Sequence, residues 1–93
     1  MNLSLERIPA YLTRSGKSHS AFYRAVHDGT HTPPVKIGAR SAAIPRHESD
    51  SIMAAEINGA TPEQLRKLVG VLMKQRRDLM PASMRDSEEV AAA

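Results

Sequence analysis

The sequence contains no cysteine, no tryptophan and only three aromatic residues, Tyr11, Phe22 and Tyr23. Without cysteine there can be no disulfide and no thiolate ligand for a metal. The longest apolar runs are a few residues, far short of the roughly 20 that a membrane-spanning helix needs. The first ten residues also lack the apolar segment of a secretory signal. We therefore expect a cytoplasmic protein without membrane spans.

Recognisable catalytic patterns are also missing. The sequence has no phosphate-binding or dinucleotide-binding glycine loop, no GxSxG and no HExxH. His27 and His31 are four residues apart, but Gly29 and the following Thr-Pro interrupt any helix that would align them as metal ligands. A chain of 93 residues forms one domain with a thin core, which leaves little room for a catalytic cleft. We expect a binding protein rather than an enzyme, with no metal and no cofactor.

Positive charge is concentrated in two segments. The net charge is +3 and the pI is about 9.7. Residues 30–46 carry three cations and no acid, and residues 61–80 carry five cations and two acids. Between them, residues 47–60 carry three acids and no lysine or arginine. Such basic segments attract phosphates, although a solvated charged surface would give the same composition.

The first half of the chain predicts two short helices joined by a tight turn. Apolar spacing favours a helix over residues 8–15, with Pro9 in its first turn and Gly16 at its C-terminal cap. Ser18 is a suitable N-cap for a second helix that continues to about His27. Phe22 and Val26 lie four residues apart on its inner face.

A basic hairpin and a third helix are predicted next. Residues 34–37 and 41–44 favour two short strands, connected by residues 38–40. A helix follows over residues 46–57 and ends at Asn58-Gly59. The predicted fold is mainly α: a winged helix-turn-helix with a two-stranded wing and an added C-terminal amphipathic helix.

The fourth helix has the clearest start signal in the chain. Thr61, Pro62 and Gln64 form a capping-box pattern, and the helix should continue to about Leu79. Its apolar face contains Leu65, Leu68, Val69 and Leu72. That face either covers its own domain or joins two copies of the chain. We accordingly predict a DNA-binding domain over residues 1–57, this helix over 61–80 and a disordered tail over 81–93.

A helix-turn-helix inserts its second helix into the major groove, where its N-terminal residues meet base edges. The predicted DNA-facing residues are therefore Lys17, Ser18, His19, Ser20, Tyr23, Arg24 and, on the wing, Lys36 and Arg40. The alternatives are that Tyr23 packs on the first helix, that Arg24 is merely solvated and that the hairpin is an ordinary surface feature. Because one such domain makes few base contacts, we expect a homodimer or an array on double-stranded DNA.

Three segments carry a resemblance to a known family. They are Arg7-Ile8-Pro9, the string SGKSHSAFYR over residues 15–24, and the string PPVKIGARS over residues 33–41. In order and spacing they resemble the AlpA family of phage and mobile-element regulators, which are small winged helix-turn-helix proteins related to excisionases and to the MerR-type DNA-binding domain. The resemblance implies a transcription regulator or an excision directionality factor, with an integrase or the transcription machinery as a partner.

The sequence departs from the family pattern at several positions. Lys17 stands where leucine is usual, Ile44 stands where a tryptophan is common, and Ile52 ends the segment that corresponds to E-V-D-x-W. Residues 58–93 lie outside the resemblance. The alternative function is a protein-interaction module, such as an antitoxin or an adaptor, that acts through the C-terminal helix.

Overall fold

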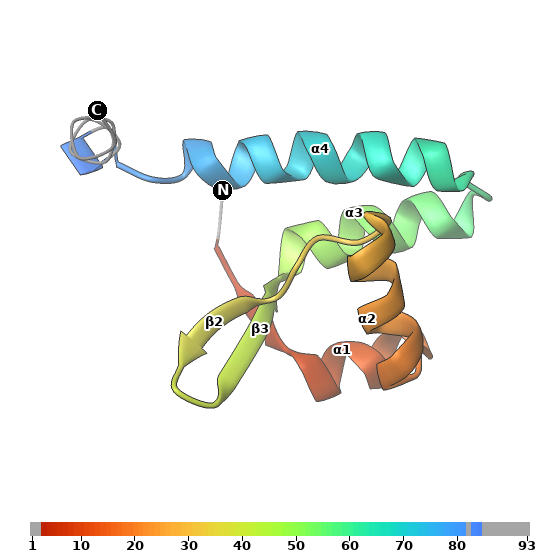
Figure 1. Cartoon of the computed structure of the whole chain (residues 1–93), viewed down its shortest axis with the longest axis horizontal. Helices are drawn as coiled ribbons and strands as arrows, with labels where there is room; N and C mark the ends of the chain where they lie inside the picture. Colours follow the sequence, from red (N-terminus) through yellow and green to blue (C-terminus); the bar gives the residue numbers. More distant parts are fainter. Residues whose placement is uncertain (1–2, 82, 85–93) are drawn as a thin grey trace.

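Four helices and a small antiparallel sheet make up residues 3–81 and 83–84, the part of the chain that the computed structural model describes (Figure 1). In chain order the elements are β1 (Leu5–Arg7), α1 (Ile8–Ser15), α2 (His19–Asp28), β2 (Val35–Gly38), β3 (Ser41–Pro45), α3 (Arg46–Ile57) and α4 (Pro62–Asp78). A largely helical domain was predicted, and this is confirmed. None of these helices is long and apolar enough to cross a membrane. The predicted tail over 81–93 lies mostly outside the described residues.

The helix ends are fixed by the caps that the sequence predicts. Gly16 adopts a left-handed conformation (φ 73°), and its N–H donates to the Leu12 carbonyl and closes α1. Two residues later the Ser18 hydroxyl accepts the Ala21 N–H at 3.1 Å and starts α2. The Thr61 and Gln64 capping box begins α4. The bounds of α1, α2 and α3 lie within one residue of the prediction, and α4 begins one residue after and ends two residues before the predicted range of 61–80.

The sheet has three strands in the order β1–β3–β2: the two predicted hairpin strands are present, and β1 is a third strand that was not predicted. β1 pairs antiparallel with β3, with Leu5 opposite Pro45. β1 was not predicted because its three residues are too few to show the alternation of a strand, and because its partner β3 lies about forty residues further along the chain. β2 begins one residue later than predicted, and a register shift interrupts its pairing with β3 between Lys36 and Gly38.

An aromatic cluster forms the centre of the core. Tyr11 from α1 and Phe22 from α2 are fully buried, with ring centroids 5.7 Å apart in an edge-to-face arrangement. The ring of His31 lies against both, at 5.2 Å from Tyr11 and 4.9 Å from Phe22. Ile8 and Ile44 complete this cluster. The core therefore fixes the angle between α1 and α2 and ties both to the sheet.

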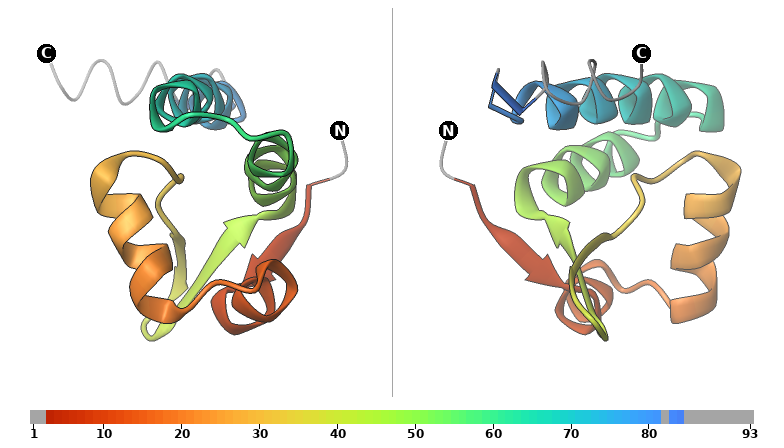
Figure 2. Two further views of the ribbon diagram at one scale, coloured as in Figure 1. Left: turned by 90° about the vertical axis from the view of Figure 1, so that its right-hand side faces the viewer. Right: turned by 60° about the vertical axis from the view of Figure 1, so that its left-hand side comes forward.

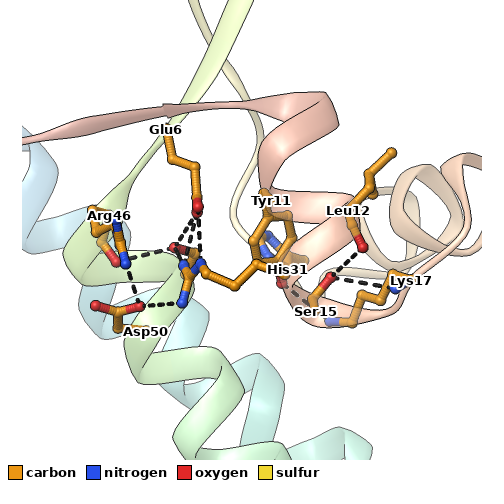
Figure 3. Close-up of polar contacts among 10 residues, drawn as sticks. Glu6, Tyr11, Leu12, Ser15, Lys17, His31, Arg46 and Asp50 are labelled. Carbon is orange, nitrogen blue, oxygen red and sulfur yellow. Dashed lines mark hydrogen bonds and ion pairs between the residues drawn. The ribbon is translucent and has the colours of Figure 1, made fainter.

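A chain of hydrogen bonds passes through this core (Figure 3). His31 Nδ1 donates to the Thr32 carbonyl at 2.8 Å, so the neutral ring accepts at Nε2 from the Tyr11 hydroxyl, also at 2.8 Å. The same hydroxyl accepts from Lys17 Nζ at 3.2 Å, and Lys17 also donates to Glu56 on α3 at 2.9 Å. Burial lowers the pKa of His31 below 6.5 and raises that of Tyr11. Both groups are therefore neutral at pH 7.

Arg14 makes a second polar connection, between α1, β1 and α3 (Figure 3). Its guanidinium donates two hydrogen bonds to the Glu6 carboxylate, at 2.7 and 2.8 Å, and a third to Asp50 at 2.9 Å. These bonds lower the pKa of Glu6 despite its burial. The strand that the sequence did not predict is thus anchored by a charged pair as well as by backbone bonds.

α4 lies across α3 and closes the domain (Figures 1 and 2). Leu72 on its inner face is buried. Arg76 donates to both oxygens of the fully buried Glu48 on α3, at 2.5 and 3.0 Å, and to the Pro33 carbonyl at 3.0 Å. Near the start of the helix, Arg66 Nε donates to the Asp28 carbonyl at the end of α2. α4 thereby fastens α3, the end of α2 and the segment before β2.

The Glu48–Arg76 pair yields a stability prediction. Arg76→Ala leaves a buried carboxylate without its cation, and we expect the free energy of unfolding to fall by about 3 kcal/mol. Arg77→Ala, on the exposed side of the same helix, should change it by less than about 0.5 kcal/mol. Urea unfolding at pH 7, followed by circular dichroism, measures both. Equal stabilities of the two variants would show that the pair does not hold α4 on the domain.

His31 yields a pH prediction. Because the pKa of His31 is lower in the folded protein than its ordinary value of 6.5, the unfolded chain takes up a proton first as the pH falls. The stabilisation by neutral His31 is present above pH 6.5 and is lost below it, with a slope of up to about 1.4 kcal/mol per pH unit.

Chemical unfolding of the parent protein and of His31→Gln between pH 7.5 and 5.0 measures this slope. The variant should show a flatter dependence on pH even if it is less stable throughout. His19→Gln, a change at an exposed histidine, is the control and should keep the parent slope. An unchanged slope in His31→Gln would contradict the assignment.

Candidate nucleic-acid interface

One face of α2 presents polar and aromatic side chains to solvent. Ser20, Tyr23, Arg24 and His27 lie at positions i, i+3, i+4 and i+7 and are all exposed; we call them the α2 strip. Phe22, on the opposite side of the helix, is held in the core. The side chain of His27 is 89% exposed. The sequence analysis did not include His27, although its spacing of seven residues from Ser20 places it on the same strip.

The start of α2 adds hydrogen-bond donors beside this strip. Ser18 caps the helix, and the first N–H groups of any helix have no partner within it. His19 is exposed and its ring lies 4.7 Å from the ring of Tyr23. This contact and the edge-to-face packing on Phe22 hold the Tyr23 ring against the helix, while the side chain stays 39% exposed. The N-terminal end of α2 can therefore offer N–H, hydroxyl and imidazole donors to an anion.

The β2–β3 hairpin contributes two exposed cations, Lys36 and Arg40. They border an open hollow of about 310 Å³ on the hairpin, which is also lined by Pro34, Ala39, Ser41 and Ala42. The hairpin turn and the first turn of α2 lie at the same end of the molecule, opposite α4, in all the views of Figures 1 and 2. The fold thus brings the predicted hairpin cations and the start of α2 to one end.

Arg7 joins this surface, and the sequence analysis did not place it there. Its Nη2 donates to the Ser41 hydroxyl at 3.2 Å, and the side chain is exposed. Arg7 stands beside the hairpin because β1 pairs with β3, where Arg7 lies opposite Ala43. The position of Arg7 beside the hairpin could have been predicted only if β1 and its pairing with β3 had been predicted. Among the described residues no carboxylate bonds to the guanidinium of Arg7, so its donors can also reach a ligand.

Lys17 does not belong to the exposed surface. It was predicted to face DNA, but its amine points inward and bonds to Glu56 and Tyr11. Both bonds and the neighbouring charges raise its pKa, although burial alone would lower it. The amine therefore stabilises the turn between α1 and α2 as a cation. We do not include it in the interface.

The apolar face of α4 packs on its own domain. Leu72 is 3% exposed, and the other three predicted self-association residues, Leu65, Leu68 and Val69, are partly buried. The hydrogen bonds of Arg66 and Arg76 hold the same helix against the domain. This arrangement corresponds to the covering role that the sequence left open beside self-association.

The acids near the domain centre are neutralised internally. Glu6, Glu48, Asp50 and Glu56 are each bonded to an arginine or a lysine. Arg24, Lys36 and Arg40 have no carboxylate partner in the described structure. Asp28 is the one acid on α2 and lies at its C-terminal end. Between residues 3 and 84, omitting 82, no three histidine or acidic side chains gather as metal ligands.

Comparisons with protein-family models, with curated proteins and with solved structures find no match for this chain. The resemblance to the AlpA family therefore stays a prediction from the residues quoted for it. What can be inferred about function comes from the α2 strip, from the hairpin cations, and from the common position of the hairpin turn and the first turn of α2 at one end of the domain.

Proposed function

We propose that this protein binds double-stranded DNA as a winged helix-turn-helix, with α2 in the major groove and the β2–β3 hairpin as the wing. The observation that carries this proposal is the α2 strip, which is exposed and free of acids, on a helix whose first turn lies at the same end of the molecule as the hairpin turn. A major groove about 12 Å wide admits one α-helix. The resemblance of residues 7–41 to the AlpA pattern supports the same function.

The chemistry of each residue indicates its role in this complex. Arg24 can donate two hydrogen bonds to guanine, and Ser20 can bond to either base of a pair. The Tyr23 hydroxyl and the free N–H groups at the start of α2 suit phosphate oxygens. Contacts to phosphate fix the position of the helix, and contacts to base edges select the sequence.

The wing acts mainly on the DNA backbone. Lys36, Arg40 and Arg7 are exposed cations on or beside the hairpin. Arginine is favoured in the minor groove because of its negative potential, and lysine pairs with phosphates as a point charge. These contacts strengthen binding to any sequence and orient the helix in its groove.

The cellular role follows the resemblance, which suggests regulation of transcription or control of excision in a mobile element. One helix and one wing make few base contacts, so specific binding should require two or more copies on repeated sites. An integrase or the transcription machinery would then be recruited on the DNA. The protein would act in the cytoplasm, at the nucleoid.

The first test concerns Arg24. Duplexes selected from a random pool by the purified protein should share a sequence, and Arg24→Ala should weaken binding to them by about 1–3 kcal/mol while leaving binding to scrambled duplexes nearly unchanged. Arg24→Lys keeps the charge but not the planar pair of donors, so it should also lose discrimination. Fluorescence anisotropy gives both affinities. If Arg24→Lys binds like the parent protein, Arg24 contacts phosphate rather than a base.

The second test concerns the wing. Lys36→Ala/Arg40→Ala should weaken binding to every duplex and reduce the slope of log affinity against log salt by about two units. The exchange Lys36→Arg/Arg40→Lys preserves both charges and should keep the parent slope. Titrations at several salt concentrations measure it. A parent slope in the double alanine variant would remove the wing from the interface.

A further inference from the structure

The outward face of α4 carries a row of cations that the proposed interface does not use. Lys67, Gly70, Lys74 and Arg77 follow one another at i, i+3, i+7 and i+10 and are all exposed; we call them the α4 row. With a rise of 1.5 Å per residue the row extends over roughly 15 Å. None of its three cations has a carboxylate partner in the described structure.

Gly70 is not explained by the fold. It lies within the 17-residue helix, where glycine is less favourable than alanine by about 1 kcal/mol. A Cβ added to Gly70 would meet no atom of the described residues within 4 Å, so nothing in that part of the chain requires a glycine there. Glycine also serves where the backbone must approach a ligand closely. The bare stretch of helix between Lys67 and Lys74 fits such an approach.

The charge of the row selects the ligand. A second copy of α4 would bring Lys67, Lys74 and Arg77 against like charges, which is unfavourable. A membrane-binding helix also needs a continuous apolar face toward the lipid, whereas Leu72 of α4 is buried and the exposed apolar side chains Val71 and Leu79 are eight positions apart. Duplex DNA presents one charge per about 1.7 Å of its axis, so a row of this length faces several phosphates.

We infer that the α4 row is a second site for the DNA backbone, independent of sequence, with which one protein holds two DNA segments. The row lies on the helix at the end of the molecule opposite the hairpin turn and the start of α2 (Figures 1 and 2). The fold therefore separates the row from the hairpin turn and from the start of α2. The holding of two segments rests on the proposed function, whereas phosphate binding by the row does not.

A two-duplex capture measures this second site. A duplex with the selected sequence is fixed to beads, the full-length protein is added, and a fluorescent duplex of unrelated sequence is supplied at increasing salt. The parent protein should retain the fluorescent duplex and release it as salt rises. Lys67→Ser/Lys74→Ser/Arg77→Ser should bind the fixed duplex within about twofold of the parent affinity and retain at least about tenfold less of the fluorescent one.

Two substitutions at uncharged residues distinguish an effect on the close approach of DNA to the helix backbone from an effect on folding. Gly70→Gln keeps every charge and should raise the melting temperature, because it removes glycine from a helix, yet it should lower capture of the second duplex several-fold. Gln75→Ser, at an exposed position beside the row, should leave capture unchanged. Capture at the parent level by Gly70→Gln would refute the role of the bare backbone.

A variant without the first site separates this inference from the proposed function. In Arg24→Ala/Lys36→Ala/Arg40→Ala, weak salt-dependent binding to unrelated duplexes should persist and should disappear when the α4 cations are also replaced. Three results would overturn the inference. The first is the absence of this residual binding, and the second is preferential binding of anionic phospholipid vesicles over duplexes. The third is that the α4 variant loses affinity for the fixed duplex itself. The last would mean that α4 contacts the same duplex as α2.

Discussion

The hydroxyl of Tyr11 is the contact on which the arrangement of the domain depends. It is buried between α1 and α2, donates to His31 and accepts from Lys17. Through these two bonds it connects the segment before the hairpin with the turn that precedes α2, and Lys17 extends the connection to α3. A buried polar chain is favourable only when every member has a partner. The position of α2 is therefore set by hydrogen bonds as well as by the packing of Phe22.

Internal ion pairs also determine where the outer charge lies. The net charge of +3 is modest, but the acids of β1 and α3 are used to hold the fold together. The cations left without acids lie on α2 and the hairpin at one end and on α4 at the other. A surface potential depends on such separation more than on the sum of charges. A weakly basic chain can thus present exposed cations on two separate surfaces.

The features that were predicted from the sequence are those that depend on residues close together in the chain. Gly16, Ser18 and the Thr61–Gln64 capping box place the helix ends, because each cap bonds within a few residues of itself. The α2 strip followed from helical spacing, apart from His27. What the sequence did not predict depends on partners distant in the chain.

Lys17 is the clearest case of a residue that was predicted in the wrong role. Its partner Glu56 is 39 positions away, so nothing near Lys17 in the sequence indicates that its amine turns inward. Its amine forms an ion pair that joins the turn between α1 and α2 to α3. The position of Arg7 was missed for the same reason, since it follows from the pairing of β1 with β3.

The order of the strands has a consequence for how the chain folds during synthesis. β3 is the central strand, so β1 has no partner until residues 41–45 have left the ribosome. The hairpin, whose strands are adjacent in sequence, can form at once, whereas closing the loop from Leu5 to Pro45 carries a larger entropic cost. The ion pair of Glu48 forms later still, because its partner Arg76 is synthesised after the strands. The nascent chain would thus hold its wing before the domain behind it is closed.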